Sequence, residues 1–288
     1  MGLKIVTDSS CDLGMDYIKE NEVGLLNLIL NINGKTIKDD FGQTLSYEEF
    51  YSEMRNGAMP TTSQANVNAF EKEFLNHVKN GDSIIYIGMS SNLSGTYNSA
   101  NIAKNNILEE YPNADISLVD SLSVSVGLGI QVAKACEMKK KGFSKDEIVE
   151  WLEENKYKVG HSIIVDDLNH LKRGGRISGA TAIVGGILNI KPTLTIDNEG
   201  RLINVDKVKG KKKAIKHIAN EIIEKAVNTE NEILYICHGD CLEEAETLKE
   251  LVLEETKFKD VIIRYLGVCV AAHGGPGALA AVFLSESR

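Results

Sequence analysis

The stretch of sequence that decides the fold reads Ser83-Ile84-Ile85-Tyr86-Ile87-Gly88-Met89-Ser90-Ser91-Asn92-Leu93-Ser94-Gly95-Thr96. It opens with an uninterrupted apolar run from Ile84 to Ile87, a pattern typical of a strand buried on both faces of a parallel sheet. A loop of small and polar residues follows, and then Ala100, Ala103 and Ile107 recur at helical spacing. The stretch therefore predicts a strand, a hydroxyl-rich loop and a helix in succession.

The loop between this strand and helix is a candidate binding place for an anion. Open α/β sheets bind ligands at the carboxyl ends of their strands, and a helix N-terminus adds free N–H donors and a partial positive charge. Gly95 lets the backbone approach closely, and the loop carries the hydroxyls of Ser90, Ser91, Ser94 and Thr96. A single serine here is more simply an N-cap, whereas the cluster around a glycine favours a site.

Composition limits the classes of function. A chain of 288 residues is comfortable for two domains, and 43% hydrophobic with 25% charged residues is typical of a soluble globular protein. The net charge of −9 argues against nucleic acid as a partner. No run reaches the roughly 18 apolar residues of a membrane span, and the N-terminus resembles no signal peptide. Five scattered cysteines indicate free thiols, so we expect a cytoplasmic protein.

Strands and helices alternate along the first half of the chain. Apolar runs at 3–7, 25–32 and 115–119 predict further strands, and Asn33-Gly34 predicts a hairpin. This alternation predicts a parallel sheet with helices on both faces.

Capping residues predict where two of the helices begin. Ser46 and Ser144 each begin a capping box with a glutamate three residues later. A further helix follows Pro60-Thr61-Thr62-Ser63-Gln64, a segment whose bare composition we interpret as turn chemistry. Small residues at Gly127 and Gly129 predict a closely packed helix after the strand at 115–119.

The pattern changes near Lys158. Apolar runs at 163–165, 232–237 and 261–263 predict strands, and Asn198-Glu199-Gly200 predicts a hairpin. The only dense basic run holds the lysines at 207, 209, 211, 212, 213 and 216. It is most simply a solvated helix start; docking on an anionic membrane surface or a protein partner remains open.

Six segments together resemble the motifs of DegV proteins, the fatty-acid-binding subunits of fatty acid kinase. They recur from Thr7 to Gly277, nearly the whole chain: Thr7-Asp8-Ser9, Pro60-Thr61-Thr62-Ser63-Gln64, Ser90-Ser91-Asn92-Leu93-Ser94-Gly95-Thr96, Leu168-Asn169-His170-Leu171-Lys172-Arg173-Gly174-Gly175-Arg176-Ile177, Ile190-Lys191-Pro192 and His273-Gly274-Gly275-Pro276-Gly277. One departure is that the family usually has arginine where Val208-Lys209-Gly210 stands.

The resemblance implies a two-domain DegV-like α/β fold. Residues 1–158 would form a three-layer α/β/α domain with a parallel sheet and the head-group loops. Residues 159–288 would form a two-layer α/β domain with a mixed sheet and the walls of an acyl tunnel. The implied ligand between the domains is a long-chain fatty acid, with no cofactor.

The resemblance also implies the site residues. The carboxylate would bind Thr62, Ser94 and His273, supported by Ser63, Ser91, Gly95, Arg173 and Arg176. Ile183, Ile187 and Ile190, in a stretch of small and apolar residues, would wall the tunnel. Taken alone, a lone histidine is more often structural, and either arginine suits an ion pair equally well.

The implied partner is a separate ATP-binding kinase subunit. It would phosphorylate the carboxylate while this chain, which is not itself an enzyme, holds the fatty acid. The acyl phosphate product would feed phospholipid synthesis, and transient contact with a membrane surface remains open.

Two other classes of function remain open. One is an autonomous serine hydrolase that uses Ser94 or Ser91 with His273, although no G-x-S-x-G elbow is present. The other is a carrier of a small anion such as a sugar phosphate or hydroxy ketone. A wholly polar pocket would favour this function. No P-loop and no G-x-G-x-x-G motif follows a strand, and Cys237-His238-Gly239-Asp240-Cys241 has no zinc-site spacing, so we expect no metal.

Overall fold

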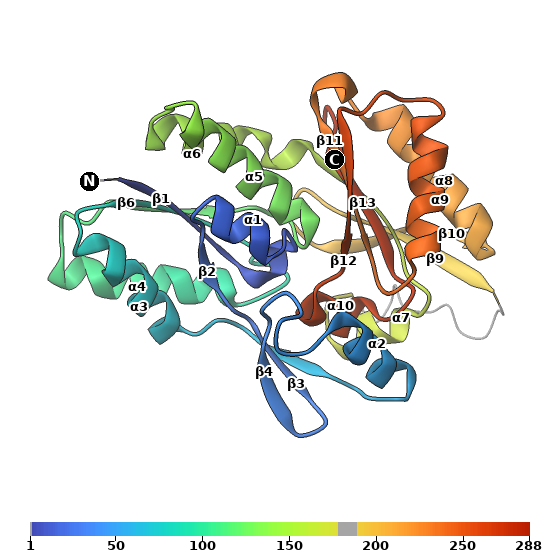
Figure 1. The fold of residues 1–288 in the computed structure, drawn as a ribbon, viewed down its shortest axis with the longest axis horizontal. Coiled ribbons are helices and arrows are strands. Elements are labelled where there is room, and N and C mark those ends of the chain that lie inside the picture. Colours follow the sequence, from blue (N-terminus) through green and yellow to red (C-terminus); the bar gives the residue numbers. More distant parts are fainter. Residues whose placement is uncertain (1, 178–188) are drawn as a thin grey trace.

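The computed structural model describes residues 2–177 and 189–288, which are built on two large β-sheets (Figure 1). The first sheet lies in the N-terminal half of the chain, and its strands are all parallel. In spatial order they are β2 (Gly24–Leu26), β1 (Leu3–Asp8), β6 (Ser83–Gly88) and β7 (Ile116–Asp120). The predicted parallel sheet is confirmed.

Strand β6 is buried on both faces, as its apolar run predicts. Ile84 and Tyr86 pack on one side of the sheet with Phe70, while Ile85 and Ile87 belong to the hydrophobic cluster on the other side. The alternation arises because successive side chains of a strand point to opposite faces.

Helices cover both faces of this sheet and complete the expected three layers. One face carries α3 (Val67–Val78) and α4 (Thr96–Glu110), and the other carries α1 (Met15–Glu20), α5 (Val126–Lys140) and α6 (Lys145–Asn155). Helix α6 begins with the predicted capping box, in which the side chains of Ser144 and Glu147 each bond the other residue's backbone N–H.

A small antiparallel sheet projects from the N-terminal half (Figure 1). Its strands, in spatial order, are β4 (Lys35–Lys38), β3 (Ile29–Ile32) and β5 (Thr61–Ser63). Asn33 and Gly34 have φ values of 49° and 75°, which a type I′ hairpin requires, so the predicted hairpin is confirmed. Helix α2 (Tyr47–Arg55) follows with Ser46 as its N-cap.

Two sequence-based expectations are wrong in this region. The segment from Pro60 to Gln64 is more than a turn, because the backbone of Thr61–Ser63 pairs with β3 as an edge strand, where a preceding proline is tolerated. The apolar run 25–32 is not one strand. The Ser9 hydroxyl and the Asp39 backbone bond the backbone of Leu28, and the chain on either side enters a different sheet.

The C-terminal half is built on a six-stranded mixed sheet, which confirms that part of the expected fold class. In spatial order its strands are β10 (Leu202–Lys209), β9 (Ile190–Ile196), β8 (Val159–Ile164), β13 (Leu279–Leu284), β11 (Ile233–His238) and β12 (Asp260–Tyr265). The β11–β12 pair is parallel and the other pairs are antiparallel. The predicted hairpin at residues 198–200 joins β9 to β10.

Helices α8 (Lys211–Lys225) and α9 (Leu242–Leu253) cover the outer face of the mixed sheet (Figure 1). Two short helices, α7 (Leu168–Arg173) and α10 (Val268–Gly274), lie together at one end of the sheet. Short 3₁₀ turns stand at Ser9–Cys11, Lys156–Lys158 and Thr229–Asn231. No helix of the described residues is long and apolar enough to cross a membrane.

Helix α5 joins the two halves, because it contacts both large sheets. Most of its residues are buried. A Cβ at Gly129 would lie 2.6 Å from the carbonyl oxygen of Cys11, and one at Gly127 would overlap the ring of His161. The predicted role of these glycines in close packing is therefore confirmed.

Candidate functional site

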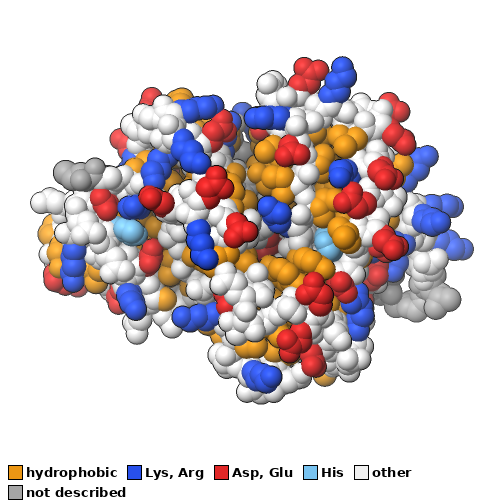
Figure 2. Space-filling view, viewed as in Figure 1, with side chains coloured by type: hydrophobic (Ala, Val, Ile, Leu, Met, Phe, Trp, Pro, Cys, Tyr) orange, Lys and Arg blue, Asp and Glu red, His pale blue; other side chains and the backbone are white. Residues whose placement is uncertain are grey.

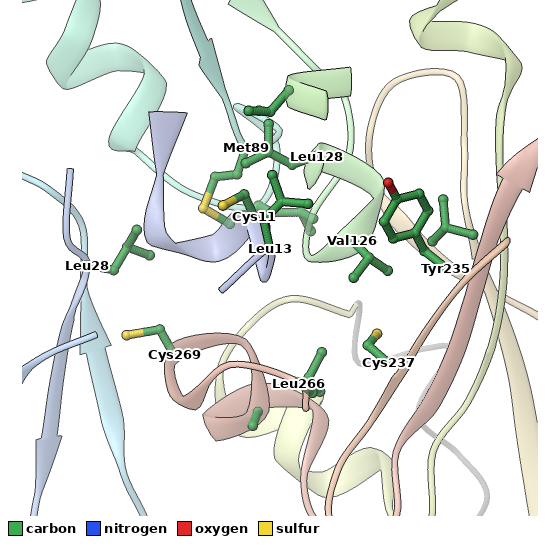
Figure 3. Close-up of a cluster of buried hydrophobic side chains, with 14 of the residues drawn as sticks. Cys11, Leu13, Leu28, Met89, Val126, Leu128, Tyr235, Cys237, Leu266 and Cys269 are labelled. Atoms are coloured by element: carbon green, nitrogen blue, oxygen red, sulfur yellow. The ribbon is translucent and has the colours of Figure 1, made fainter. Parts of the chain in front are cut away.

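A cavity of about 410 Å³ lies where the inner face of the mixed sheet meets the loops of the N-terminal half. Most of its wall is apolar, and it includes Leu28, Met89, Val126, Leu194, Leu266 and Val282. Figure 3 shows how side chains from both halves gather here, among them Leu28, Met89, Val126 and Leu266. The volume falls within the range of small-molecule sites, about 300–1,000 Å³.

Three polar side chains from distant parts of the chain line this cavity, and we call the part of the wall that they form the mouth. Thr62 comes from β5, Ser94 from the loop before α4, and His273 from the last turn of α10. The Thr62 hydroxyl oxygen lies 2.8 Å from Nε2 of His273. The Ser94 hydroxyl lies 2.8 Å from the hydroxyl of Thr96.

Gln64 holds β5 against the start of α4. Its amide donates a hydrogen bond of 2.7 Å to the hydroxyl of Ser99. A Cβ at Gly95 would overlap the Gln64 amide, so only glycine allows this approach. Gly95 thus lines the cavity and also allows β5 to approach the start of α4 closely.

The hydroxyls of the Ser90–Thr96 loop have different roles. Ser90 is buried, and its hydroxyl donates to the carbonyl of Gly200 at 2.8 Å, which ties the loop to the β9–β10 hairpin. Ser91 is exposed and does not line the cavity. Ser94 is the serine of this loop that lines the cavity, and Ser63, on β5, lines it as well.

His273 is neutral at pH 7. Burial, reinforced by the positive charges of Arg176 and Arg173, lowers its pKa to about 4. Within the described residues its Nδ1 has no hydrogen-bond partner, and it packs on Gly174, where a Cβ would overlap it. Buried N–H groups without partners are rarer than buried acceptors without partners. We therefore place the proton on Nε2, which donates to Thr62 and leaves the Thr62 hydroxyl hydrogen free for a ligand.

The two predicted supporting arginines lie in different places. Arg176 lines the cavity and bonds two backbone carbonyls, Nε to Leu93 at 3.0 Å and Nη1 to Gly174 at 2.5 Å. Burial lowers its pKa from the ordinary arginine value. Arg173 is exposed, lies 3.0 Å from Nδ1 of His170, and does not line the cavity. Arg176 is thus the cation at the mouth.

The predicted tunnel residues fall mostly elsewhere. Ile183 and Ile187 lie outside the described residues, and Ile190 is half-buried on β9 without lining the cavity in the described part of the chain. The inner face of β8 supplies walls that the sequence analysis missed, namely His161 and Ile163. The alternation of His161, Ile163 and Val165 was the available signal.

A second polar group lies deeper in the cavity wall. Ser125 donates to the carboxyl of Asp12, and its hydroxyl lies 3.4 Å from the sulfur of Cys237. Burial raises the pKa of Asp12 well above its usual range. His161 is 4% exposed, burial and the charge of Arg288 lower its pKa to about 3, and neither ring nitrogen has a partner among the described residues.

The geometry bears on the other classes of function. Ser94 is bonded to Thr96 and His273 to Thr62, so these two residues do not form a serine–histidine pair. Among the described residues, no group of three His, Cys, Asp or Glu side chains is arranged to hold a metal ion. On the surface in Figure 2, apolar side chains are exposed in the middle of the face and acidic and basic ones are interspersed around them.

Comparisons with known proteins give the family. The family model described as "Uncharacterised protein, DegV family" matches residues 2–286. A DegV domain-containing protein of Clostridium perfringens is 44% identical over 284 residues, which are 99% of this chain and 98% of that protein.

Solved structures share the fold. One is the structure of a DegV family protein from Thermus thermophilus, described as showing fatty acid binding. That protein is 30% identical to this chain with a TM-score of 0.89, and the match covers 99% of this chain and 100% of that one. The fatty acid binding DegV family protein of Streptococcus agalactiae is 29% identical with a TM-score of 0.87, covering 100% of both chains. The chain described here belongs to the DegV family.

Proposed function

We propose that this protein binds a long-chain fatty acid in the cavity, with its carboxylate at the mouth and its chain along the apolar wall. The carboxylate is held by the hydroxyls of Thr62 and Ser94, with His273 orienting Thr62 and Arg176 supplying positive charge. The single observation that carries this proposal is a largely apolar cavity whose wall includes Thr62, Ser94 and His273. Two related structures are titled as fatty acid binding proteins, which supports it.

The acyl tail and the carboxylate head group contribute differently to the free energy of binding. Burying each CH₂ group contributes about 0.8 kcal/mol, so a chain with roughly a dozen buried CH₂ groups gains on the order of 10 kcal/mol. Each hydrogen bond to a charged group contributes about 1.5–3 kcal/mol. The tail therefore supplies most of the affinity, and the mouth fixes which end of the ligand faces out.

We further propose that the protein presents the carboxylate to a separate ATP-dependent kinase subunit in the cytoplasm. That subunit transfers the γ-phosphoryl group of ATP to a carboxylate oxygen, giving acyl phosphate and ADP. In this arrangement residues 1–158 form the head-group domain and residues 159–288 the acyl domain. The placement of every strand of the mixed sheet from Val159 onward supports that division.

Mass spectrometry of an organic extract of the purified, untagged protein tests the binding. We expect stoichiometric long-chain fatty acid in the wild type and clearly less in the Thr62→Ala/Ser94→Ala double variant. Ser91→Ala is the matched control, because Ser91 lies on the same loop outside the cavity. Absence of lipid in the wild type, even after incubation with a fatty acid mixture, would overturn the proposal.

A trapping experiment tests the kinase step. Acyl phosphate reacts with hydroxylamine to give a hydroxamate, so the product can be counted. We expect no hydroxamate from the loaded protein with Mg-ATP alone, and hydroxamate once a fatty acid kinase subunit is added. Product from the chain alone would show that it is an enzyme in its own right.

A further inference from the structure

The wall of the cavity contains a buried histidine that the proposed function does not use. His161 lines the cavity and is 4% exposed, and neither of its ring nitrogens has a hydrogen-bond partner among the described residues. Ser125, another buried polar side chain of this wall, has partners, because it donates to Asp12 and contacts Cys237. A neutral imidazole carries one N–H donor and one acceptor. His161 can therefore form a hydrogen bond, as donor or as acceptor, with a polar group of whatever occupies the cavity.

The fold holds this imidazole rigidly. Its ring packs against α5 at Gly127, where a Cβ would overlap Nε2. On the mixed sheet, His161 lies on β8 opposite Val282 of β13, and the Thr195 hydroxyl donates to its carbonyl oxygen at 2.7 Å. The sheet thus fixes the backbone of His161, and the contact with α5 limits how far its ring can turn.

The position of His161 along β8 gives its depth in the cavity. Val165 directly follows β8 and leads into α7, which packs against α10, the helix that carries His273 of the mouth. His161 is four residues away on the same line of side chains, so the two positions are separated by about 13 Å along the strand. An acyl chain that begins at the mouth and follows β8 passes His161 part-way along its length.

We propose that the cavity selects a fatty acid whose chain carries a hydroxyl group, and that His161 is the residue that recognises this hydroxyl. The inference rests on the proposed function. A hydroxyl is both a donor and an acceptor, so it can pair with the ring nitrogen that it reaches whether or not that nitrogen carries the proton. A plain methylene chain offers the buried ring no hydrogen bond, which is costly in a dry environment.

Competition binding tests the inference. The protein, stripped of lipid, is incubated with an equimolar mixture of octadecanoic acid, a cis-octadecenoic acid and hydroxyoctadecanoic acids that carry the hydroxyl at successive positions. The bound fraction is then identified by mass spectrometry. We expect the wild type to prefer a mid-chain hydroxy acid over octadecanoic acid by about tenfold, the effect of one well-formed hydrogen-bonded pair.

Variants assign the preference to His161. In His161→Leu the preference for the hydroxy acid should disappear while octadecanoic acid still binds, and His161→Gln, which keeps a donor and an acceptor, should retain part of it. Ile163→Leu is the matched control, because it changes the same wall of the cavity without a polar group. Thermal unfolding of each chain verifies that it is folded.

The outcomes separate the two proposals. Equal binding of hydroxylated and plain acids, a preference for the cis-unsaturated acid, or a hydroxy preference that persists in His161→Leu would overturn the inference and leave fatty acid binding intact. Failure of every acid to bind the wild type would overturn the proposed function and this inference with it.

Discussion

His273 and His161 are neutral imidazoles on the wall of one cavity, and burial lowers the pKa of both, to about 4 and about 3. They differ in their surroundings. His273 is only partly buried and bonds Thr62, while His161 is almost fully buried and has no partner among the described residues. A histidine with a partner is part of a preformed anion site. A histidine without one is a buried polar group that destabilises the folded protein, and a hydrogen bond from a ligand can offset that cost.

The largest expected effect concerns acid stability at His161. In the folded protein the pKa of His161 is about 3, so its neutral form is favoured. In the unfolded chain the pKa of the same side chain is 6.5. As the pH falls below 6.5 the unfolded chain takes up a proton and the folded chain does not, so folding is progressively disfavoured. The wild type should lose about 1.4 kcal/mol per pH unit relative to His161→Leu, or about 2.7 kcal/mol by pH 4.5.

Chemical denaturation of both chains at several pH values measures this difference. Other titrating groups, including the buried Asp39 and Asp12, are present in both chains, so their contributions cancel in the comparison. Parallel stability curves for the two chains between pH 6.5 and 4.5 would contradict the assignment of His161 as a buried neutral group.

An intermediate effect is expected at the glycine beneath each histidine. Gly127→Ala should destabilise the protein by about 1–3 kcal/mol, because the new methyl group overlaps the immobile His161 ring. In a His161→Ala background the same change should become neutral or stabilising by up to about 1 kcal/mol, since alanine is the better helix former. A double-mutant cycle of unfolding free energies measures the coupling.

Gly174→Ala gives the matched change at the mouth. A Cβ at Gly174 would overlap Nδ1 of His273, but that ring is only partly buried and can move aside. Its stability cost should therefore be smaller than that of Gly127→Ala. An equal loss of stability from Gly127→Ala and Gly174→Ala would contradict this comparison of the two histidines. So would a Gly127→Ala change that destabilises both the wild type and the His161→Ala chain.

The smallest expected effect is on ligand affinity at the mouth. Thr62→Val keeps the size of the side chain but removes the hydroxyl that bonds His273 at 2.8 Å. Fatty acid binding should weaken by about tenfold, the effect of about 1.5 kcal/mol at the lower end of the range for a hydrogen bond to a charged group. Thr61→Val on the same strand is the control, since Thr61 is exposed and does not line the cavity. Titration with a fluorescent fatty acid that gives the same affinity for both variants would remove Thr62 from the carboxylate site.

Local patterns predicted much of the fold. The buried strand at Ser83–Gly88, the Asn33-Gly34 hairpin and the capping box at Ser144 each depend on residues only a few positions apart, and each is present. The segment at Thr61–Ser63 was misjudged because its strand partner lies on β3, some thirty residues earlier in the chain. A composition of hydroxyl residues carries no information about such a partner.

In the candidate site too, short motifs were predictable from the sequence and contacts between distant residues were not. The motif resemblance brought Thr62, Ser94 and His273 into one hypothesis, and the structure places all three on the same cavity. It named Ser94 as a ligand and Ser91 as a supporting residue, but it could not show that Ser91 lies outside the cavity or that Ser90 bonds Gly200, because these placements depend on tertiary contacts. Nor did it single out His161, whose importance lies in the absence of a partner within the described residues.

The sequence by itself determined the α/β class, the positions of most strands and helices, and the family, because these follow from periodicity and from short contiguous motifs. The tertiary structure alone decided which hydroxyl faces the cavity, which glycine lies beneath which histidine, and which buried imidazole remains unpaired. The physical reason is that hydrogen bonds and close packing join residues more than 200 positions apart, as between Thr62 and His273, which are 211 positions apart. Such contacts exist only after the two sheets have met across α5.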